Sequence, residues 1–340
     1  MHRVVWQYHP ELVGKFHQPA GLRSPVELAA LTPAVFADLP RLGEPEPVFS
    51  GDVAELRAAT RTVTPWAAER PSLDLASYAH LFVADHASAA VLLDRLAGIP
   101  ELVHVAQIQP PLTAAFRASR RASASPAPSY KASDDLTVAQ GYLDDAPGGI
   151  GARHAWAVAG GRGAGVTVID VEAGWNLGHE DLNAYPGDPF YGTNYPNEHG
   201  TGVLGIISGV GNLPSHTGIQ RVASDAVARV AAVEMDSEQD PITLQWVRKW
   251  NAADAIYVSA RTFSAGDVIL LEMHGPGPKP VVKFAEDAYV PVEYWIAERA
   301  AIEFAVAAEL YVVEAGGNGH ENLDDPLYGG IFDPANDSGA

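Results

Sequence analysis

The segment "GVTVID", Gly165 to Asp170, is the stretch that decides the fold of this chain. It is a short, continuous apolar run, rich in β-branched residues. Three further runs of the same kind follow it: "ARVAAVEM" ending at Met235, "DVILLE" ending at Glu272 and "LYVVEAGG" ending at Gly317. Runs of this length and composition are typical of strands buried on both faces of a parallel sheet.

Helical stretches are expected between these strands, over residues 201–208, 242–253 and 293–310. Strands that alternate with helices predict an α/β architecture built on a parallel sheet. In such sheets the functional groups gather beyond the carboxyl ends of the strands, which is where the search for a site begins.

A different pattern precedes residue 117. "LASYAHLFVA" predicts a strand ending near Val83, and Asp85 can cap a following helix. "LVHVAQIQ" then returns as a second strand after Gly98, which ends the helix. The apolar face of that helix is expected to comprise Ala89, Leu92, Leu93 and Leu96. A small α+β unit is therefore predicted, with further strands from the residues before it.

The two regions are joined by "RASRRASASPAPSYKAS", residues 117–133, which is rich in Ala, Ser and Pro and has no hydrophobic period. This composition predicts an exposed, flexible linker, and its Arg120-Arg121 pair leaves open a processing site. The chain is thus divided into residues 1–116, the linker, and residues 134–340.

Composition excludes several functions. The 340 residues include 22 Lys plus Arg and 42 Asp plus Glu, a formal net charge of −20, so nucleic acid is not expected as a partner. There is no Cys, hence no disulfide and no thiolate nucleophile. Neither a secretory signal nor a membrane-spanning run is recognisable, and no membrane partner is expected. The compartment stays open, with the cytoplasm as the default.

Three polar residues lie at positions where the α/β pattern predicts functional groups, beyond the strand ends and at a helix start. Asp170 ends the first strand, Asn318 follows the last, and His199 begins a helix in "HGTG". A carboxylate that holds one imidazole nitrogen leaves the other nitrogen free to take a proton. An Asn amide on a glycine-rich loop is a suitable donor to a developing oxyanion. Taken singly, each has a plain reading as a loop, cap or turn residue; the ordered set indicates catalysis.

The segments "GAGVTVIDVEAGWNLGHEDL", "HGTGVLGII" and "YVVEAGGNG" resemble the aspartate, histidine and oxyanion-asparagine segments of the subtilisin-like serine peptidases. The resemblance implies a parallel-sheet, three-layer subtilisin-like domain, incomplete at its C-terminus, and a serine endopeptidase activity. It also implies Asp170 as the residue that orients the histidine, His199 as general base and then acid, and Asn318 as oxyanion donor.

Further roles follow from the same resemblance. "DVILLEMHG" is similar to the strand and loop that pair with an extended peptide substrate, so Leu271, Glu272 and Met273 would border the primary pocket. Glu272 there would favour basic residues before the cleaved bond. The unit before the linker resembles a prosegment that occupies the active site until it is cleaved. The resemblance also implies calcium as a possible structural ion and no other cofactor. Members of the family are commonly secreted.

The sequence departs from the family at three places. Val-Glu-Ala-Gly follows Asp170 instead of Ser/Thr-Gly, and Gly202 stands where a second histidine is common. The nucleophilic serine in Gly-Thr-Ser is absent, since none of the serines after His199 has that context. We therefore expect an N-terminal part of a longer peptidase, inactive by itself. The alternative is an inactive pseudopeptidase that binds peptides along "DVILLE" by strand addition.

Two other functions are disfavoured. The glycines of "GGRGAG", Gly160 to Gly165, precede a strand, whereas a dinucleotide cradle follows one. A hydrolytic metal site drawn from His179, Glu180, Asp181 and His199 lacks the spacing that would make these ligands converge.

Overall fold

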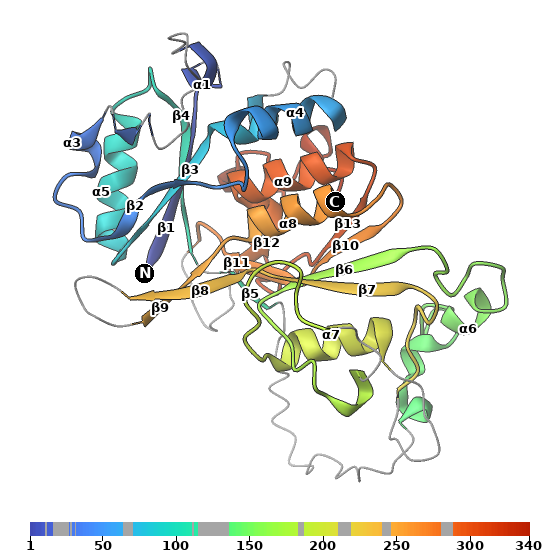
Figure 1. Ribbon diagram of the computed structural model, residues 1–340. Coiled ribbons are helices and arrows are strands. Elements are labelled where there is room, and N and C mark those ends of the chain that lie inside the picture. Colours follow the sequence, from blue (N-terminus) through green and yellow to red (C-terminus); the bar gives the residue numbers. More distant parts are fainter. Residues whose placement is uncertain are drawn as a thin grey trace.

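The computed structural model describes residues 1–10, 12–15, 27, 29–30, 32–63, 71–110, 112–114, 136–182, 187–209, 219–239, 246–279 and 288–340. The predicted linker, residues 117–133, lies outside the described residues. Two sheets organise the molecule: a four-stranded sheet near the N-terminus and a four-stranded parallel sheet that α-helices cover (Figure 1).

The N-terminal sheet has the order β2-β3-β1-β4, and β3 pairs antiparallel with both β2 and β1. Its strands are β1 (His2–Tyr8), β2 (Arg41–Pro47), β3 (Tyr78–Val83) and β4 (Val103–Gln109). The helix predicted before residue 98 is α5 (His86–Ala97), and Asp85 accepts the Ser88 amide as its N-cap. The α+β pattern read from this part of the sequence is confirmed, because capping and hydrophobic period agree here.

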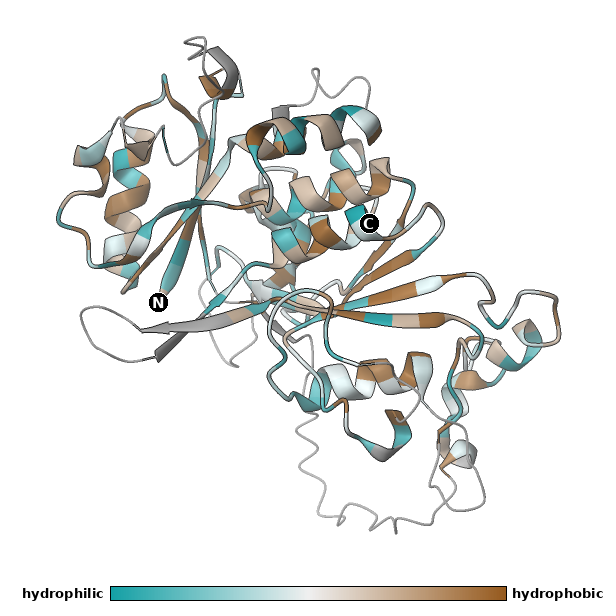
Figure 2. Ribbon diagram, viewed as in Figure 1, coloured by the Kyte–Doolittle hydropathy of each residue, from teal (hydrophilic) through white to brown (hydrophobic). Residues whose placement is uncertain are grey.

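The parallel sheet has the order β13-β10-β6-β7, and all three of its pairings are parallel. It contains β6 (Thr167–Glu172), β7 (Val227–Ala232), β10 (Val268–Leu271) and β13 (Tyr311–Glu314). These are the four apolar runs of the sequence, and their mostly hydrophobic colouring is visible in Figure 2. The predicted α/β architecture is confirmed.

Helices cover the two faces of this sheet unequally. On one face, α8 (Ala252–Thr262) and α9 (Ile296–Ala307) lie side by side, and on the other α7 (Glu198–Ser208) packs against β6 and β7 (Figure 1). Beyond α7, the second face of β10 and β13 carries apolar side chains that stay in contact with solvent. Tyr311 is 67% exposed and Val313 is 50% exposed. A parallel sheet is ordinarily covered on both faces, so this part of the surface is atypical.

One predicted helix is wrong in part. The structure places a strand, β9 (Trp246–Trp250), within the range 242–253, and the first residues of that range lie outside the described ones. Trp and Val favour a pleated ribbon, and β9 pairs antiparallel with β8 (Glu234–Gln239). The helix starts only after Asn251, whose side chain accepts the Asp254 amide. An N-cap therefore decides where α8 begins.

The remaining described elements are a small sheet, further helices and 3-10 turns. A small sheet has the order β12-β11-β5, formed by β5 (Thr113–Ala114), β11 (Met273–Pro276) and β12 (Tyr289–Pro291). The other α-helices among the described residues are α1 (Leu12–Lys15), α3 (Pro33–Phe36), α4 (Val53–Val63) and α6 (Ala152–Ala155). The described 3-10 turns are Pro71–Leu73, Leu75–Ser77, Thr137–Ala139, Gly141–Leu143, Glu180–Leu182, Val292–Tyr294, Pro326–Tyr328 and Pro334–Asn336.

A buried ion pair joins the N-terminal sheet to the helices of the parallel sheet. Arg3 on β1 is fully buried and lies 3.5 Å from Glu298 on α9. Its guanidinium also donates to His80 Nδ1 (3.0 Å), to Gln109 Oε1 (2.9 Å) and to Asn251 Oδ1 (2.9 Å). Because a buried charge without partners is costly, this network holds the two parts in one arrangement.

In the part of the chain that the structure describes, no helix has both the length and the apolar character needed to cross a membrane.

Candidate functional site

The candidate site lies at the carboxyl end of β6, where two acidic side chains follow each other at positions i and i+2. Asp170 and Glu172 point to the same side of the strand because side chains alternate along a strand. Both carboxyl groups are fully buried. Two residues correspond to about 6.6 Å along the strand, so Asp170 lies beneath the sheet edge and Glu172 lies at it.

His199 lies at this edge of the sheet, in the first turn of α7. Asn197 is the N-cap of the helix and accepts the backbone N–H of His199 at 2.8 Å. The next residue, Gly200, lets the helix approach closely, since a Cβ there would lie 2.4 Å from the carbonyl oxygen of Gly174. Gly200 therefore allows the start of α7 to pack against the chain at Gly174.

Glu172, and not Asp170, is the carboxylate in contact with the imidazole. Glu172 Oε1 lies 2.5 Å from His199 Nδ1. Burial alone would lower the pKa of His199, but the hydrogen bond and charge of Glu172, together with the charge of Glu272, raise it. Burial raises the pKa of Glu172, and its contact with His199 opposes that effect. The arrangement is a carboxylate–imidazole pair in which Glu172 holds Nδ1 of His199.

Asp170 is engaged elsewhere. Its Oδ2 accepts the indole N–H of Trp175 at 2.8 Å. Burial, and then the charge of Glu172, hold the pKa of Asp170 well above its usual range. Two like charges so close in an apolar setting do not both ionise, so Asp170 carries the proton of the pair. Asp170 lies two residues further from the end of β6 than Glu172 does. For this reason Glu172 makes the contact with His199 that was expected of Asp170.

Asn318 is brought to the same edge through His274. The backbone N–H of Asn318 donates to His274 Nδ1 at 3.1 Å. Burial, and then the charge of His199, lower the pKa of His274 to about 4. His274 thus holds the start of the Asn318 loop against β11.

The three predicted pocket residues differ in accessibility. Leu271 and Met273 are buried, at 0% and 1% exposure, while Glu272 between them is half-buried. Glu272 acts electrostatically on Asp170, Glu172 and His199. Only Glu272 of the three is therefore placed to meet a charged group of a ligand.

A strand from the N-terminal part of the chain lies beside this region. β5 pairs antiparallel with β11, with Met273 opposite Ala114 and His274 opposite Thr113. On its other edge β11 pairs with β12, where His274 is opposite Pro291. The segment after the candidate pocket thus already holds an added strand from this same chain.

Three serine hydroxyls of the second region donate to groups other than His199. Ser208 donates to the Leu204 carbonyl at 3.0 Å, Ser259 to the Ala255 carbonyl at 2.7 Å, and Ser338 to Glu293 at 2.5 Å. Ser215 lies outside the described residues. The first two bonds are local ones within helices, which agrees with the sequence-based exclusion of these serines as nucleophiles.

Among the described residues no group of three or more His, Asp and Glu side chains is arranged to hold a metal ion. His179 accepts the Asp181 amide at its Nδ1, a contact within one turn, while His199 faces Glu172. The glycines at 160, 163 and 165 adopt positive φ in turns that lead into β6. Calcium as a structural ion stays a prediction.

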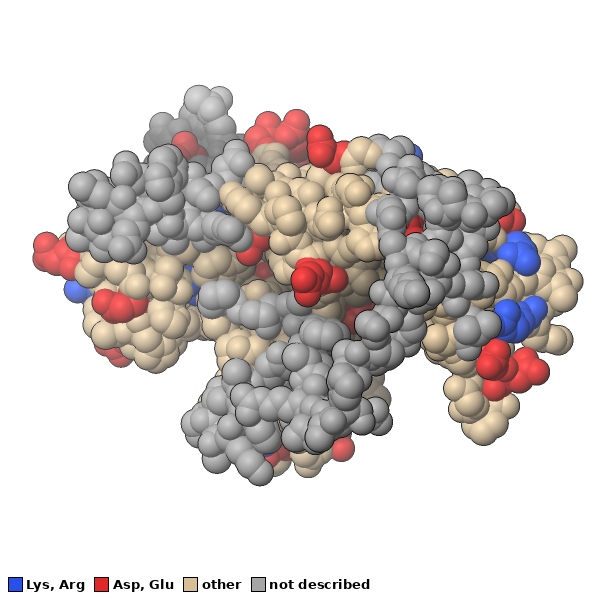
Figure 3. Space-filling view, turned by 90° about the horizontal axis from the view of Figure 1, so that it is seen from below, with Lys and Arg blue, Asp and Glu red and all other residues tan. Residues whose placement is uncertain are grey.

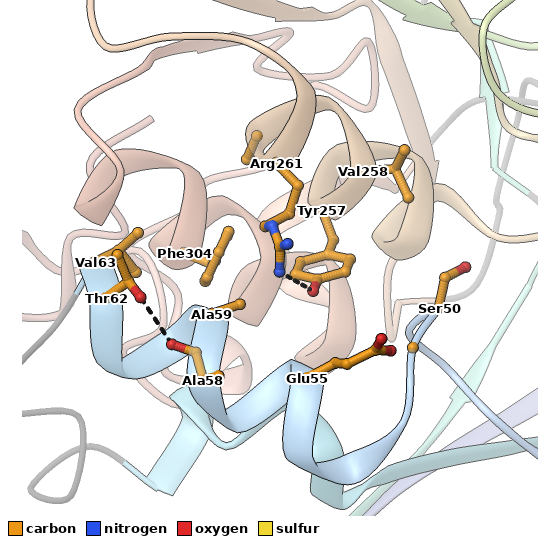
Figure 4. A pocket seen from close by; sticks show the side chains of 12 residues that line it. Ser50, Glu55, Ala58, Ala59, Thr62, Val63, Tyr257, Val258, Arg261 and Phe304 are labelled. Atoms are coloured by element: carbon orange, nitrogen blue, oxygen red, sulfur yellow. Dashed lines mark hydrogen bonds between the residues drawn. The ribbon is translucent and has the colours of Figure 1, made fainter.

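A cavity of about 650 Å³ lies elsewhere, between α4 and the helices α8 and α9 (Figure 4). Its walls include Ala58, Ala59 and Phe304, and its charged groups are Glu55 and Arg261. Arg261 donates to the Tyr257 hydroxyl at 3.2 Å. This cavity is on the face of the parallel sheet opposite α7, so it is separate from the His199 site.

Sequence reasoning missed Glu172 and His274. A signal for Glu172 was present: Val171 continues the strand, which puts the residue after it on the same face as Asp170 and closer to the edge. His274 follows a strand in "EMHG", but nothing local distinguishes it from an ordinary histidine, since its partner is a residue far along the chain.

Comparisons with known proteins add little to this geometry. No protein-family model matches the sequence, and no curated protein matches it. Among solved structures the chain is similar to fervidolysin from Fervidobacterium pennivorans, described as a keratinolytic enzyme related to subtilisin, with 11% identity and a TM-score of 0.44. The alignment covers 92% of this chain and 39% of fervidolysin.

Proposed function

We propose that this chain forms the proton-transfer and peptide-binding part of a subtilisin-like serine endopeptidase. The observation that carries the proposal is the Glu172–His199 pair at the carboxyl end of a buried parallel sheet. The Asn318 loop, which His274 holds, follows the end of another strand of the same sheet. His199 is then the general base that takes the proton of a serine nucleophile and returns it to the leaving amine. Glu172 orients the imidazole, and Asn318 donates to the oxyanion.

The nucleophile is proposed to come from a segment that is not among these 340 residues. The exposed apolar face formed by Tyr311 and Val313 supports this, because a further helix packed there would complete the second layer on the sheet. That helix would lie beside α7, within reach of its histidine.

A peptide substrate is proposed to bind by strand addition along β11. The pairing of β5 with β11 supports both this mode and an inhibitory role for the N-terminal unit, since β5 occupies the edge that a substrate strand would use. Glu272 and the chain's net charge of −20 favour peptides with a basic residue before the cleaved bond. On the face shown in Figure 3, the coloured side chains are mostly acidic.

The test uses the protein extended by the residues encoded after Ala340. We expect a fluorophosphonate probe to label it, and His199→Ala to abolish labelling because the serine loses its base. Peptides with Arg before the cleaved bond should be hydrolysed faster than the same peptides with Phe. Labelling that persists in His199→Ala would place the base elsewhere.

The second candidate function is a pseudopeptidase that binds peptides without cleaving them, and the β5–β11 pairing is the observation in its favour. It predicts peptide binding that survives His199→Ala, with no labelling of the extended protein. Finding no Gly-Thr-Ser segment encoded after Ala340 would decide in favour of this function.

A further inference from the structure

His274 is an imidazole placed in the interior of a three-stranded sheet. It lies on β11 between β5 and β12 and is fully buried. Its ring meets the ring of Tyr289 edge to face, with centroids 4.8 Å apart. Histidines are more often partly exposed, so a polar ring at this depth requires a physical reason.

The contact with Asn318 defines the state of the ring. The Asn318 amide is a donor, so Nδ1 of His274 is an acceptor and the ring proton is on Nε2. Burial and the charge of His199 lower the pKa of His274 to about 4, which keeps this neutral form populated at neutral pH. A protonated ring would present an N–H to the Asn318 N–H and lose the bond.

The loop that carries Asn318 has little other freedom. Gly317 has φ +85°, which a residue with a side chain rarely adopts. A Cβ on Gly319 would lie 2.2 Å from the Tyr289 carbonyl oxygen, so the backbone there lies against β12. The Gly319 carbonyl accepts the Ala288 amide at 3.3 Å. The loop is held after Asn318 by backbone contacts and at Asn318 by the His274 side chain.

We infer that His274 is a positioning residue that fixes the Asn318 carboxamide at the reaction centre by accepting the Asn318 backbone N–H. This inference rests on the proposed function, because it assigns His274 a part in presenting the oxyanion donor. His274 acts only through Asn318 and does not itself transfer a proton.

The other ring nitrogen supports a role for Nδ1 beyond packing. Nε2 of His274 is buried and has no hydrogen-bond partner in the described parts of the chain. A buried N–H without a partner carries a free-energy cost, which an apolar ring of the same size would avoid. Phe at this position would bury similar surface without that cost and without the bond to Asn318.

The experiment compares His274→Phe and His274→Asn in the protein extended beyond Ala340, with His154→Phe as control, because His154 is exposed on α6. Asn places an oxygen near the position of Nδ1, and Phe has no acceptor. We expect kcat to fall about 100-fold in His274→Phe with KM nearly unchanged, since a small misplacement of a catalytic group has an effect of that size. His274→Asn should recover most of kcat, and His154→Phe should match the wild type.

A second measurement is independent of turnover. Hydrogen exchange at the Asn318 amide should be slow in the wild type, faster in His274→Phe and slow again in His274→Asn. An unchanged kcat in folded His274→Phe, while Asn318→Ala lowers kcat, would overturn the positioning role and leave the peptidase proposal standing. If Asn318→Ala and His199→Ala both leave hydrolysis unchanged, the proposed function itself fails. Exchange at Asn318 would then still report whether the contact exists.

Discussion

At the scale of single residues, the site depends on which of two neighbouring carboxylates meets the imidazole. Asp170 and Glu172 share a strand face, and both are buried, but only Glu172 lies at the sheet edge beside α7. The longer Glu side chain reaches His199 from the end of the strand. Asp170 instead contacts the Trp175 indole, so it stabilises the strand end rather than the base.

Paired substitutions separate the two roles. Glu172→Gln removes the charge that raises the pKa of His199, so an NMR titration should show that pKa decreasing, and kcat of the extended protein should fall by up to about 10⁴-fold. Asp170→Asn keeps an acceptor for Trp175 and replaces a carboxyl group that is already neutral, so the His199 titration and kcat should change little. The reverse result would return the orienting role to Asp170.

At the scale of elements, the N-terminal sheet is attached to the helices of the parallel sheet through β1 and α9. Arg3 and Glu298 are both fully buried, and Gln109 donates to Glu298 at 2.7 Å. Burial raises the pKa of Glu298, and the charge of Arg3 opposes the rise. The pair therefore stabilises this arrangement only while both members are present.

Removing one partner should be far more damaging than removing both. We expect Arg3→Met to lower the free energy of unfolding by about 3–5 kcal/mol, because Glu298 is left buried without its counter-charge. Adding Glu298→Leu to Arg3→Met should restore part of the loss. Arg41→Met is the control, since its pair with Glu44 is exposed and such pairs contribute up to about 1 kcal/mol. Chemical denaturation measures all of these, and equal losses in Arg3→Met and Arg41→Met would contradict the buried pairing.

At the scale of the whole molecule, buried titratable groups of both kinds set the dependence of stability on pH. Burial and the charge of Arg3 lower the pKa of His80 to about 4, and burial with the charge of Glu293 raises the pKa of Glu314 to about 8. His80 accepts from Arg3 at Nδ1, so a proton there would face the guanidinium. Protonation of His80 at low pH and ionisation of Glu314 at high pH each lower the stability of the folded chain.

As pH rises, His80 and Glu314 change the stability in opposite directions over overlapping pH windows. The unfolded chain protonates His80 near pH 6.5 and the folded one only near pH 4, so stability falls as pH drops through that window. Glu314 ionises near pH 4.5 when unfolded and near pH 8 when folded, so its contribution falls as pH rises between those values. The two windows overlap between about pH 4.5 and 6.5, where the effects oppose each other, so thermal unfolding from pH 4 to 8 should show a plateau there and a decline toward pH 8. Glu314→Gln should remove the decline and expose the His80 slope below pH 6.5. His80→Asn should extend the decline down to about pH 4.5; an unchanged profile in both variants would assign the effect to other groups.

The sequence alone determined the local part of this protein. The four apolar runs became β6, β7, β10 and β13, and Asp85 and Gly98 bounded α5 as their chemistry predicts. His199 at the start of a glycine-containing helix could also be read from its neighbours. Such features depend on hydrophobic period, capping and backbone freedom, which act over a few residues.

Only the tertiary structure decided which residues meet. Asp170 and Glu172 carry equivalent local signals, and the depth of each along β6 relative to α7 selected Glu172. The role proposed for His274 follows from its hydrogen bond with Asn318, and the role proposed for β11 follows from its pairing with β5. Both contacts join segments that are far apart in the chain. Residues 246–250 became a strand because β8 was available as a partner. Local sequence patterns do not distinguish these side chains, because contacts between distant segments determine which of them meet. The strands could therefore be predicted from the sequence, whereas the site required the tertiary structure.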